Sequence, residues 1–367
     1  MRLLIFADSH SHAFRPYSEI LPSGRNSRLQ DTLDVLEQIY RICRNEEVEG
    51  VLFGGDLFHA RSVLNVATFN DVYEAIAKIK TAVKFFVLLV GNHDQSNKLG
   101  TVHSTKTFGA VVDVIDQPKW YIGEAEEETV NIFAVPYMDS KEQIVEAINT
   151  GLDTYSGDRE NSATLLLGHF GVSGAEPGAN FVLKSGDLPT LPDLKPQFFD
   201  QVFLGHYHMP QEPLPNVRFV GASMQHNWGD AKQVRGIWLY DTTPGAGYAT
   251  PFLYPLTAPR FVRVQATDLE TNSQNFKGHF VRVVFNQHTS RTDWDNIREW
   301  LLTKIGARWA EEWLELPESQ TATTGSYTPS MDLEDMIDLY VDSEAESDNL
   351  DLQLLKVMGH EFVRSCR

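Results

Sequence analysis

The chain has 367 residues, of which 42% are hydrophobic and 22% charged, a balance typical of globular proteins. It contains no run of about 18 apolar residues, which argues against a membrane span. Its net charge of −19 argues against a protein that binds nucleic acid through its overall charge. The two cysteines, Cys43 and Cys366, form no CxxC pair and favour a reducing, cytoplasmic location.

The first 242 residues alternate apolar runs with amphipathic segments, a pattern that predicts an α/β domain. The N-terminal apolar run reaches Asp8 too soon for a signal peptide, so we interpret it as the first strand. Helices are predicted near residues 29–43 and 67–80, and from Ser140, which forms a capping-box pattern with Gln143. The predicted strands are residues 3–7, 50–53, 84–90, 131–135, 164–167, 201–204, 217–220 and 236–240.

The remainder of the chain has a different pattern. Residues 243–260 are rich in Pro and Gly and are predicted to form a linker. Strand patterns at 261–264, 279–285 and 309–316, with a helix pattern at 292–305, predict a small α+β domain over residues 261–320. Residues 321–367 form an acidic tail, in which 350–363 has the pattern of a short amphipathic helix.

Five of the predicted strands lead directly into polar residues that can bind metal ions. Open α/β sheets bind their ligands at the carboxyl ends of strands, so these residues are expected to form one site. Their mixture of imidazole, carboxylate and amide groups suits divalent ions such as manganese better than soft ions, which prefer thiolates. In chain order the candidates are Asp8, His10, Asp56, His59, Asn92, His93, Asp94, His169, His206 and His208.

Each motif alone has a simpler explanation. An Asp-x-His pair or a Gly-His-x-His turn can lie on a solvated loop, but Gly-Asn-His-Asp after seven nearly all-apolar residues has little use in packing. The ordered combination therefore favours a metal site. The other histidines are interpreted as surface or supporting groups, with His226 the one expected to approach substrate; they are His12, His103, His226, His279, His288 and His360.

Together, Asp-x-His, Gly-Asp-x-x-His, Gly-Asn-His-Asp, a later Gly-His and a final Gly-His-x-His resemble the five motifs of calcineurin-like metallophosphoesterases. Narrower features resemble the nuclease subunits of SbcCD-type DNA-repair exonucleases. They are the Leu-Phe-His ending at 57–59, Val-Pro-Tyr at 135–137, the Gly-His-x-His-x-Pro-Gln stretch at 205–211 and the loop at 221–230. The resemblance implies an α/β, four-layer metallophosphoesterase β-sandwich flanked by helices, with a small α+β C-terminal capping domain.

The resemblance also implies roles for individual residues. One ion would be held by Asp8, His10, Asp56 and His208. A second ion would be held by Asp56, Asn92, His169 and His206. Mn²⁺ is the expected metal, with Mg²⁺ as the alternative. His93 would assist the leaving oxygen with support from His59 and Asp94, and the expected substrate-binding residues are His226 and Arg61.

The function implied is a manganese-dependent DNA exonuclease with endonuclease activity in repair or recombination. By the same resemblance, the chain would form a homodimer and work with a coiled-coil ABC-type ATPase of the SbcC kind. The predicted helix at 350–363 is the candidate docking element for that ATPase. Two alternatives remain: a phosphoesterase for small nucleotides or phosphoproteins, and a non-enzymatic protein-binding scaffold.

Overall fold

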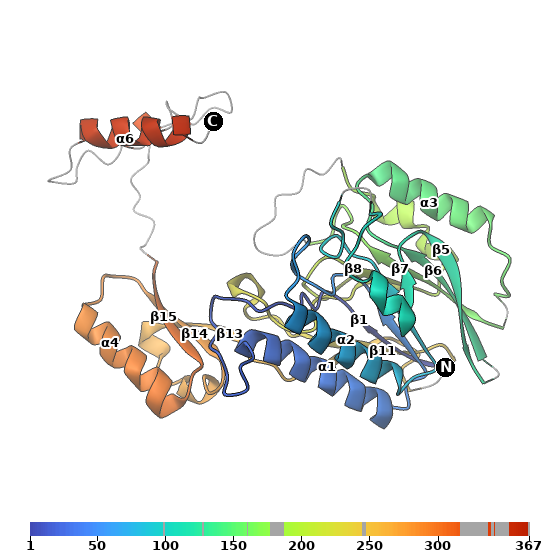
Figure 1. Cartoon of the computed structure of the whole chain (residues 1–367), viewed down its shortest axis with the longest axis horizontal. Coiled ribbons are helices and arrows are strands. Elements are labelled where there is room, and N and C mark those ends of the chain that lie inside the picture. Colours follow the sequence, from blue (N-terminus) through green and yellow to red (C-terminus); the bar gives the residue numbers. More distant parts are fainter. Residues whose placement is uncertain are drawn as a thin grey trace. The chain divides into compact units, whose positions relative to one another are not determined.

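The computed structural model describes residues 1–97, 100–126, 128–159, 161–176, 187–243, 247–315, 337–338, 341 and 352–365 (Figure 1). The chain divides into two compact units, Met1–Val284 with Thr289–Trp313, and Phe285–His288 with Leu314–Arg367. Within the described ranges, no helix is long and apolar enough to cross a membrane. Cys43 is buried as a free thiol, and Cys366 lies outside these ranges.

The first sheet has six strands in the order β12-β11-β1-β2-β3-β4. The neighbours β1 to β4 run parallel, and β11 runs antiparallel to β1. The strands are β1 (Arg2–Phe6), β2 (Gly50–Phe53), β3 (Phe85–Leu89), β4 (Asp113–Ile115), β11 (Gly236–Asp241) and β12 (Phe252–Pro255).

The second sheet also has six strands, in the order β5-β6-β7-β8-β10-β9. Its central strands β6, β7, β8 and β10 are parallel, with antiparallel strands at both edges. They are β5 (Lys119–Ala125), β6 (Glu128–Val135), β7 (Ala163–His169), β8 (Gln201–Gly205), β9 (Gln211–Leu214) and β10 (Val217–Phe219).

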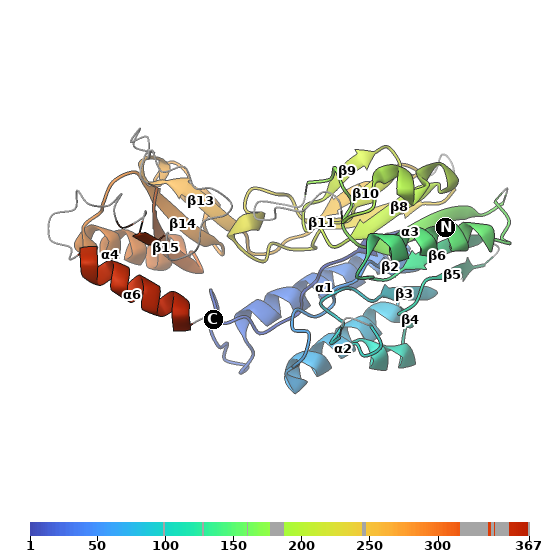
Figure 2. The ribbon, with the colours of Figure 1, turned by 90° about the horizontal axis from the view of Figure 1, so that it is seen from above.

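Alternation along the strands produces the layers. In β1, Leu3 and Ile5 face the second sheet, whereas Leu4 and Phe6 face the helices α1 (Ser27–Asn45) and α2 (Val66–Lys80). Helix α3 (Lys141–Asp153) covers the outer face of the second sheet. Figures 1 and 2 show these helices on opposite sides of the paired sheets. The four-layer α/β sandwich expected from the sequence is therefore confirmed.

Local sequence explains where the helices begin. Asn26 Oδ1 accepts hydrogen bonds from the backbone N–H groups of Arg28 and Leu29 at the start of α1. Ser140 Oγ accepts one from Gln143 N at 3.3 Å, so the predicted cap of α3 is present.

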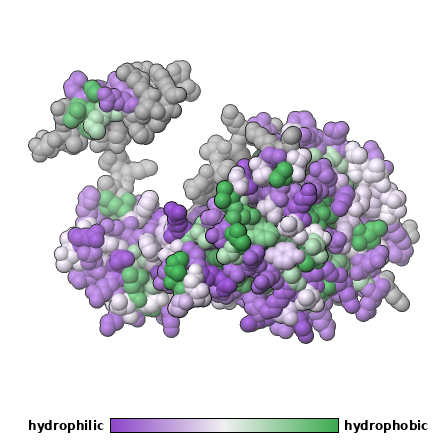
Figure 3. Space-filling view, in the orientation of Figure 1, coloured by the Kyte–Doolittle hydropathy of each residue, from purple (hydrophilic) through white to green (hydrophobic). Residues whose placement is uncertain are grey.

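The face shown in Figure 3 is mainly hydrophilic, with separate smaller apolar areas, as expected when most apolar residues lie in the interior.

A third sheet, with the order β13-β14-β15, follows the sandwich. It is flanked by α4, which continues as a π-helical turn at Trp300–Ile305. These strands and this helix are the elements that the sequence predicts for residues 261–320. Their bounds are β13 (Phe261–Gln265), β14 (Phe280–Phe285), β15 (Trp309–Leu314) and α4 (Arg291–Glu299).

The sequence also anticipated two further segments. The stretch 243–260, expected as a linker, contains β12, which pairs antiparallel with β11 and so completes the edge of the first sheet. The helix expected near 350–363 is present as α6 (Leu352–Ser365). Short helical turns lie at Lys106–Ala110, Leu191–Leu194, Pro196–Phe198, Trp228–Asp230, Ala266–Asp268 and Ser273–Asn275.

Candidate metal centre

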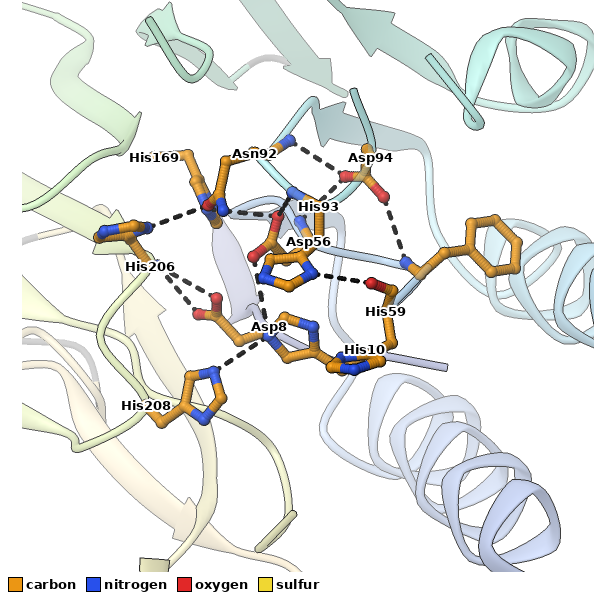
Figure 4. Close-up of polar contacts among 12 residues, drawn as sticks. Asp8, His10, Asp56, His59, Asn92, His93, Asp94, His169, His206 and His208 are labelled. Atoms are coloured by element: carbon orange, nitrogen blue, oxygen red, sulfur yellow. Dashed lines mark hydrogen bonds and ion pairs between the residues drawn. The ribbon is translucent and has the colours of Figure 1, made fainter. Parts of the chain in front are cut away.

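The predicted ligands converge where five parallel strands end (Figure 4). The loops after β1, β2 and β3 come from the first sheet, and His169 and the loop after β8 come from the second. Backbone hydrogen bonds join the first two loops, because Asp8 N donates to Gly55 O at 2.9 Å and His10 N donates to Asp56 O at 3.0 Å. Both sheets thus contribute to one site.

Four of the predicted ligands have left-handed backbone conformations. The φ angles are +52° at Asp8, +42° at His10, +60° at Asp56 and +91° at His206. Such conformations cost non-glycine residues roughly 1–3 kcal/mol each and persist only where the surroundings enforce them. Their concentration at one place is a mark of a site built for function rather than for stability.

The first group of ligands consists of Asp8, His10 and His208, whose ligand atoms lie within 4.8 Å of one another. His10 Nε2 lies 3.0 Å from His208 Nε2 and 3.6 Å from Asp56 Oδ2. His206 N donates to both carboxylate oxygens of Asp8 at 3.1 Å, which fixes the orientation of that side chain. Three imidazole or carboxylate groups therefore face a common point.

The second group is formed by Asn92, His169 and His206. Asn92 Oδ1 lies 3.0 Å from His169 Nε2 and 3.0 Å from His206 Nδ1. His169 Nε2 lies 3.4 Å from Asp56 Oδ1. Asp56 therefore directs one oxygen towards each group, the arrangement needed for a shared carboxylate.

These separations fit pairs of ligands that bind the same ion. Two atoms that each lie about 2.1 Å from an ion, at right angles, are about 3 Å apart. His169 Nδ1 donates to Gly54 O at 2.6 Å, which leaves Nε2 directed at the oxygens of Asn92 and Asp56. Nitrogen and oxygen donors of this kind suit divalent cations of borderline hardness. The residues present thus fit two ions.

Comparison with known proteins identifies the family. Residues 1–210 match the sequence profile of the calcineurin-like phosphoesterases, over more than half of the chain. The chain belongs to the calcineurin-like phosphoesterase family. Members of this family use divalent metals, and the fold and the donor set described above are those of a phosphoesterase.

Three relatives have similar sequences. A putative phosphoesterase of Invertebrate iridescent virus 3 is 29% identical over 53% of this chain and 53% of its own length. Exonuclease subunit 1 of Enterobacteria phage T4 is 25% identical over 57% of this chain and 58% of its own. The DNA double-strand break repair protein Mre11 of Sulfurisphaera tokodaii is 26% identical over 49% of this chain and 44% of its own. This chain spans about half the length of each.

Glycines allow the phosphoesterase loops to approach one another. Gly55 has φ +99°, and a Cβ there would collide with the His169 ring. A Cβ on Gly91 would collide with the Asp56 carboxylate and backbone N. Glycine at these two positions, directly before or within the ligand loops, therefore permits the close approach of the loops.

Burial and neighbouring charges set the protonation of the ligands. Burial lowers the pKa of His10 well below its usual range, and burial together with His169 lowers the pKa of His206 to about 3. Burial opposes the charged form of His169 as well, but Asp56 and Asp8 outweigh it and raise the pKa of that ring to about 9. His10 and His206 are therefore neutral and able to bind metal at neutral pH, while His169 holds a proton in the ion-free site. Burial also opposes the charged form of His208, but Asp230 and Asp8 outweigh it and raise the pKa of that ring.

Asp56 and Asp8 differ in their titration. Burial raises the pKa of the Asp56 carboxyl, but His169 and His10 outweigh burial and hold it well below its usual range. Burial and the Asp56 charge raise the pKa of Asp8 to about 6. Both carboxyl groups are thus mainly ionised near pH 7, which favours a cation between them.

His93 is held against His59. Its backbone N donates to Asp56 Oδ1 at 2.7 Å, and its Nδ1 donates to the backbone oxygen of His59 at 2.8 Å. The two rings are stacked, with centroids 5.3 Å apart and planes inclined by 21°. A ring whose Nδ1–H is held by a carbonyl can present Nε2 to a substrate. The predicted pairing of His59 with His93 is present in this geometry.

Asp94 has a different position from the other predicted catalytic residues. It is fully buried, and its carboxylate accepts hydrogen bonds from the backbone N–H groups of four residues at 3.0–3.1 Å: Asp56, Leu57, Phe58 and Gly91. These bonds join the loops after β2 and β3. The structure therefore gives Asp94 contacts that hold the Asp56 loop in place, whereas the carbonyl of His59 orients His93.

Sequence reasoning missed Asp230. Its Oδ2 accepts a hydrogen bond from His226 N at 2.7 Å, and its Oδ1 lies 3.8 Å from His208 Nδ1. A carboxylate beside the outer nitrogen of a metal-binding histidine fixes the orientation of the ring. The sequence does show an acidic residue at the end of the 221–230 loop. Unlike the predicted ligands, however, Asp230 does not directly follow a predicted strand.

His226 and Arg61, the predicted substrate residues, both line a pocket of 480 Å³ at the metal centre. His226 Nε2 donates to Asp8 O at 3.0 Å, so this ring also supports the Asp8 loop. Phe14 and Tyr17 line the same pocket. Among the described residues that line it, none is one of the remaining predicted supporting histidines, which are His12, His103, His279, His288 and His360.

Proposed function

We propose that this chain is a two-metal phosphodiesterase that cleaves DNA, as an exonuclease with endonuclease activity, and that Mn²⁺ is its metal. The observation that carries the two-metal part is the position of Asp56, with Oδ2 3.6 Å from His10 Nε2 and Oδ1 3.4 Å from His169 Nε2. The DNA part is supported by the similarity to T4 exonuclease subunit 1 and to Mre11, a DNA repair protein.

Two bound divalent ions would supply an activated water and neutralise the charge of the phosphoryl oxygens. The chain's own residues do the rest. The water oxygen, after losing one proton to solvent, forms a bond to phosphorus, and the bond from phosphorus to the leaving oxygen breaks. His93 gives its Nε2 proton to that oxygen while Nδ1–H remains bonded to the carbonyl of His59. The stacked His59 ring restricts rotation of the donor.

The walls of the pocket suit a nucleotide. Phe14 and Tyr17 offer aromatic faces and edges beside the metal centre, and Arg61 adds an exposed cation. Aromatic rings stack on nucleobases and cations pair with the backbone, a combination used by proteins that bind single strands. A DNA end that enters this pocket can therefore be held on both its base and its phosphate.

The partner proposal concerns α6. Leu355, Val357 and Met358 are 38%, 51% and 57% exposed on this helix. Exposed apolar side chains on a short amphipathic helix can bind in an apolar groove of a partner protein. We propose that α6 binds the coiled-coil ABC-type ATPase and that the chain acts as a homodimer. Pull-down of that ATPase with the chain, with and without residues 331–367, tests the docking role; unchanged capture after truncation would refute it.

Digestion of end-labelled duplex and single-stranded DNA with Mn²⁺ or Mg²⁺ tests the substrate. Bis-p-nitrophenyl phosphate, a cyclic nucleotide and a phosphopeptide are assayed in parallel, with the Asp56→Asn variant as the control for contaminating nucleases. We expect DNA to be shortened from its ends in the presence of Mn²⁺ by wild type alone. Turnover of the small diester or the phosphopeptide without DNA cleavage would instead support the small-substrate alternative.

A further inference from the structure

A second hollow adjoins the metal centre and has an unusual charge for this protein. It has a volume of 680 Å³ and lies between residues 224–235 and 255–263, with Asn275 and His279 also on its wall. We call it the basic groove, and its cationic residues are Lys232, Arg235, Arg260 and Arg263. Among the described residues, no Asp or Glu lines it. A cation-lined, acid-free groove on a chain of net charge −19 requires a specific explanation.

The groove lies beside the active-site pocket. Gln233 lines both hollows. Asp230 lines the pocket and forms an ion pair of 2.8 Å with Arg235, which lines the groove. Gln225 ties the two walls of the groove, because its Nε2 donates to Gln233 O at 2.9 Å and its Oε1 accepts from Phe261 N at 2.7 Å. A chain that leaves the metal centre past Gln233 therefore enters the groove.

Arg235 is a buried cation on the wall of the groove. Its side chain is only 5% exposed, and one nitrogen, Nη2, contacts Asp230. Within the described part of the chain, Nε and Nη1 of this guanidinium have no hydrogen-bond partner. Buried charged donors without acceptors are costly, at about 1–3 kcal/mol for each unmade bond. These two nitrogens have almost no accessible surface, so Arg235 adds positive charge to the wall of the groove rather than a direct contact to a ligand.

We infer that the basic groove binds phosphate groups of the DNA backbone beyond the scissile bond. This inference rests on the proposed function and extends it, since it names the surface that holds the strand. Lys232, Arg260 and Arg263 are exposed and can contact successive phosphates. Charge complementarity favours DNA as the ligand of the basic groove. A polyanion is attracted to these cations, although the rest of the acidic chain repels it.

The test uses a triple variant of the exposed cations, Lys232→Gln with Arg260→Gln and Arg263→Gln. Arg235 is left in place because its ion pair supports the loop that carries His226. The matched control removes three exposed cations from elsewhere on the surface, Arg41→Gln with Lys84→Gln and Lys119→Gln. Both variants change the net charge by the same amount. Binding of a fluorescent 20-nucleotide duplex is measured with Ca²⁺ in place of Mn²⁺, and cleavage is measured separately with Mn²⁺.

We expect the groove variant, and not the control, to bind duplex DNA at least about tenfold more weakly. The slope of log affinity against log salt should decrease in magnitude by about 2 to 3, since each duplex phosphate contact contributes about 0.9. Equal affinities and slopes in both variants would overturn the groove assignment, as would absence of DNA binding by wild type. A parallel loss of bis-p-nitrophenyl phosphate hydrolysis would also overturn it, because that small diester reports only on the metal centre.

The two proposals can fail separately. Groove-dependent binding without any DNA cleavage would refute the nuclease activity and leave the groove standing. Cleavage of DNA by wild type, with binding that the groove variant leaves unchanged, would refute the groove and leave the nuclease standing.

Discussion

His10 and His208 lie 198 residues apart in the chain, yet their Nε2 atoms face each other at 3.0 Å. His10 follows β1 of the first sheet, and His208 follows β8 of the second. A cation placed between the two rings would take a lone pair from each Nε2 atom, as an ion with both rings as ligands does. The contact therefore links the pairing of the two sheets to the chemistry of the site.

Removal of the shared carboxylate should abolish hydrolysis. In Asp56→Asn an uncharged amide, with one oxygen and one NH₂ group, replaces the carboxylate whose two oxygens face His10 and His169. Since metal-ion stabilisation contributes several kcal/mol, we expect kcat on bis-p-nitrophenyl phosphate to fall at least about a thousandfold. His206→Ala should have a similar effect. Circular dichroism should show an intact fold, and the exposed Asp34→Asn serves as the control; near wild-type turnover of a folded Asp56→Asn variant would refute the site.

Loss of His93 should affect the chemical step and leave metal binding intact. We expect His93→Ala to lower kcat about 10²- to 10⁴-fold on DNA, whose leaving oxygen needs a proton. The loss should be smaller on bis-p-nitrophenyl phosphate, because nitrophenolate leaves without protonation. Metal content is measured on the same samples. An equal loss on both substrates would exclude His93 as the proton donor, and loss of metal would make it a structural support.

Metal binding should release a proton from His169. Its pKa is raised to about 9 in the ion-free site, so the ring is protonated at pH 7 and competes with the ion for Nε2. Affinity for Mn²⁺ should therefore rise as pH increases towards 9 and level off above it. Calorimetry at pH 7 in two buffers of different ionisation enthalpy should give about one proton released per chain. A proton count near zero would contradict the assigned charge of His169.

Arg28 should be a major source of stability. The guanidinium is 1% exposed, donates to the backbone oxygen of His226 at 3.2 Å, and lies 5.1 Å and 4.9 Å from the ring centroids of Phe261 and Phe280. It thus joins α1, the 221–230 loop and the third sheet. Since breaking a buried charged contact costs about 3–5 kcal/mol, Arg28→Met should lower the free energy of unfolding in urea by about that amount.

The exposed Arg41 provides the matched control for that measurement. Arg41 pairs with Glu37 on the same helix and is 68% exposed. Arg41→Met should change the unfolding free energy by less than about 0.5 kcal/mol. Equal effects of the two substitutions would show that the buried contacts of Arg28 contribute little.

The central strands and the order of the ligands could be predicted because each rests on a local pattern. A run such as Phe-Phe-Val-Leu-Leu is buried on both faces, and the Gly-Asn-His-Asp that follows it adds nothing to an apolar core. The edge strands β4, β5, β9 and β12 were missed. Each has a sheet neighbour on one side only, so their sequences mix exposed and polar residues, and β9 and β12 both contain Pro.

The supporting contacts of the site could not be predicted from sequence, for a related reason. Asp94 was expected to act on His93, but its four hydrogen bonds go to backbone groups whose positions depend on how the loops fold together. Asp230 reaches His208 only because the 221–230 loop returns to the end of β8. Such contacts arise from tertiary structure and leave no periodicity or spacing in the chain.

The most direct measurement is an anomalous difference map at the manganese absorption edge from crystals grown with Mn²⁺. The account predicts two peaks on either side of the Asp56 carboxylate, one beside His10 and His208 and the other beside Asn92, His169 and His206. A single peak away from Asp56, or none at saturating Mn²⁺, would contradict it.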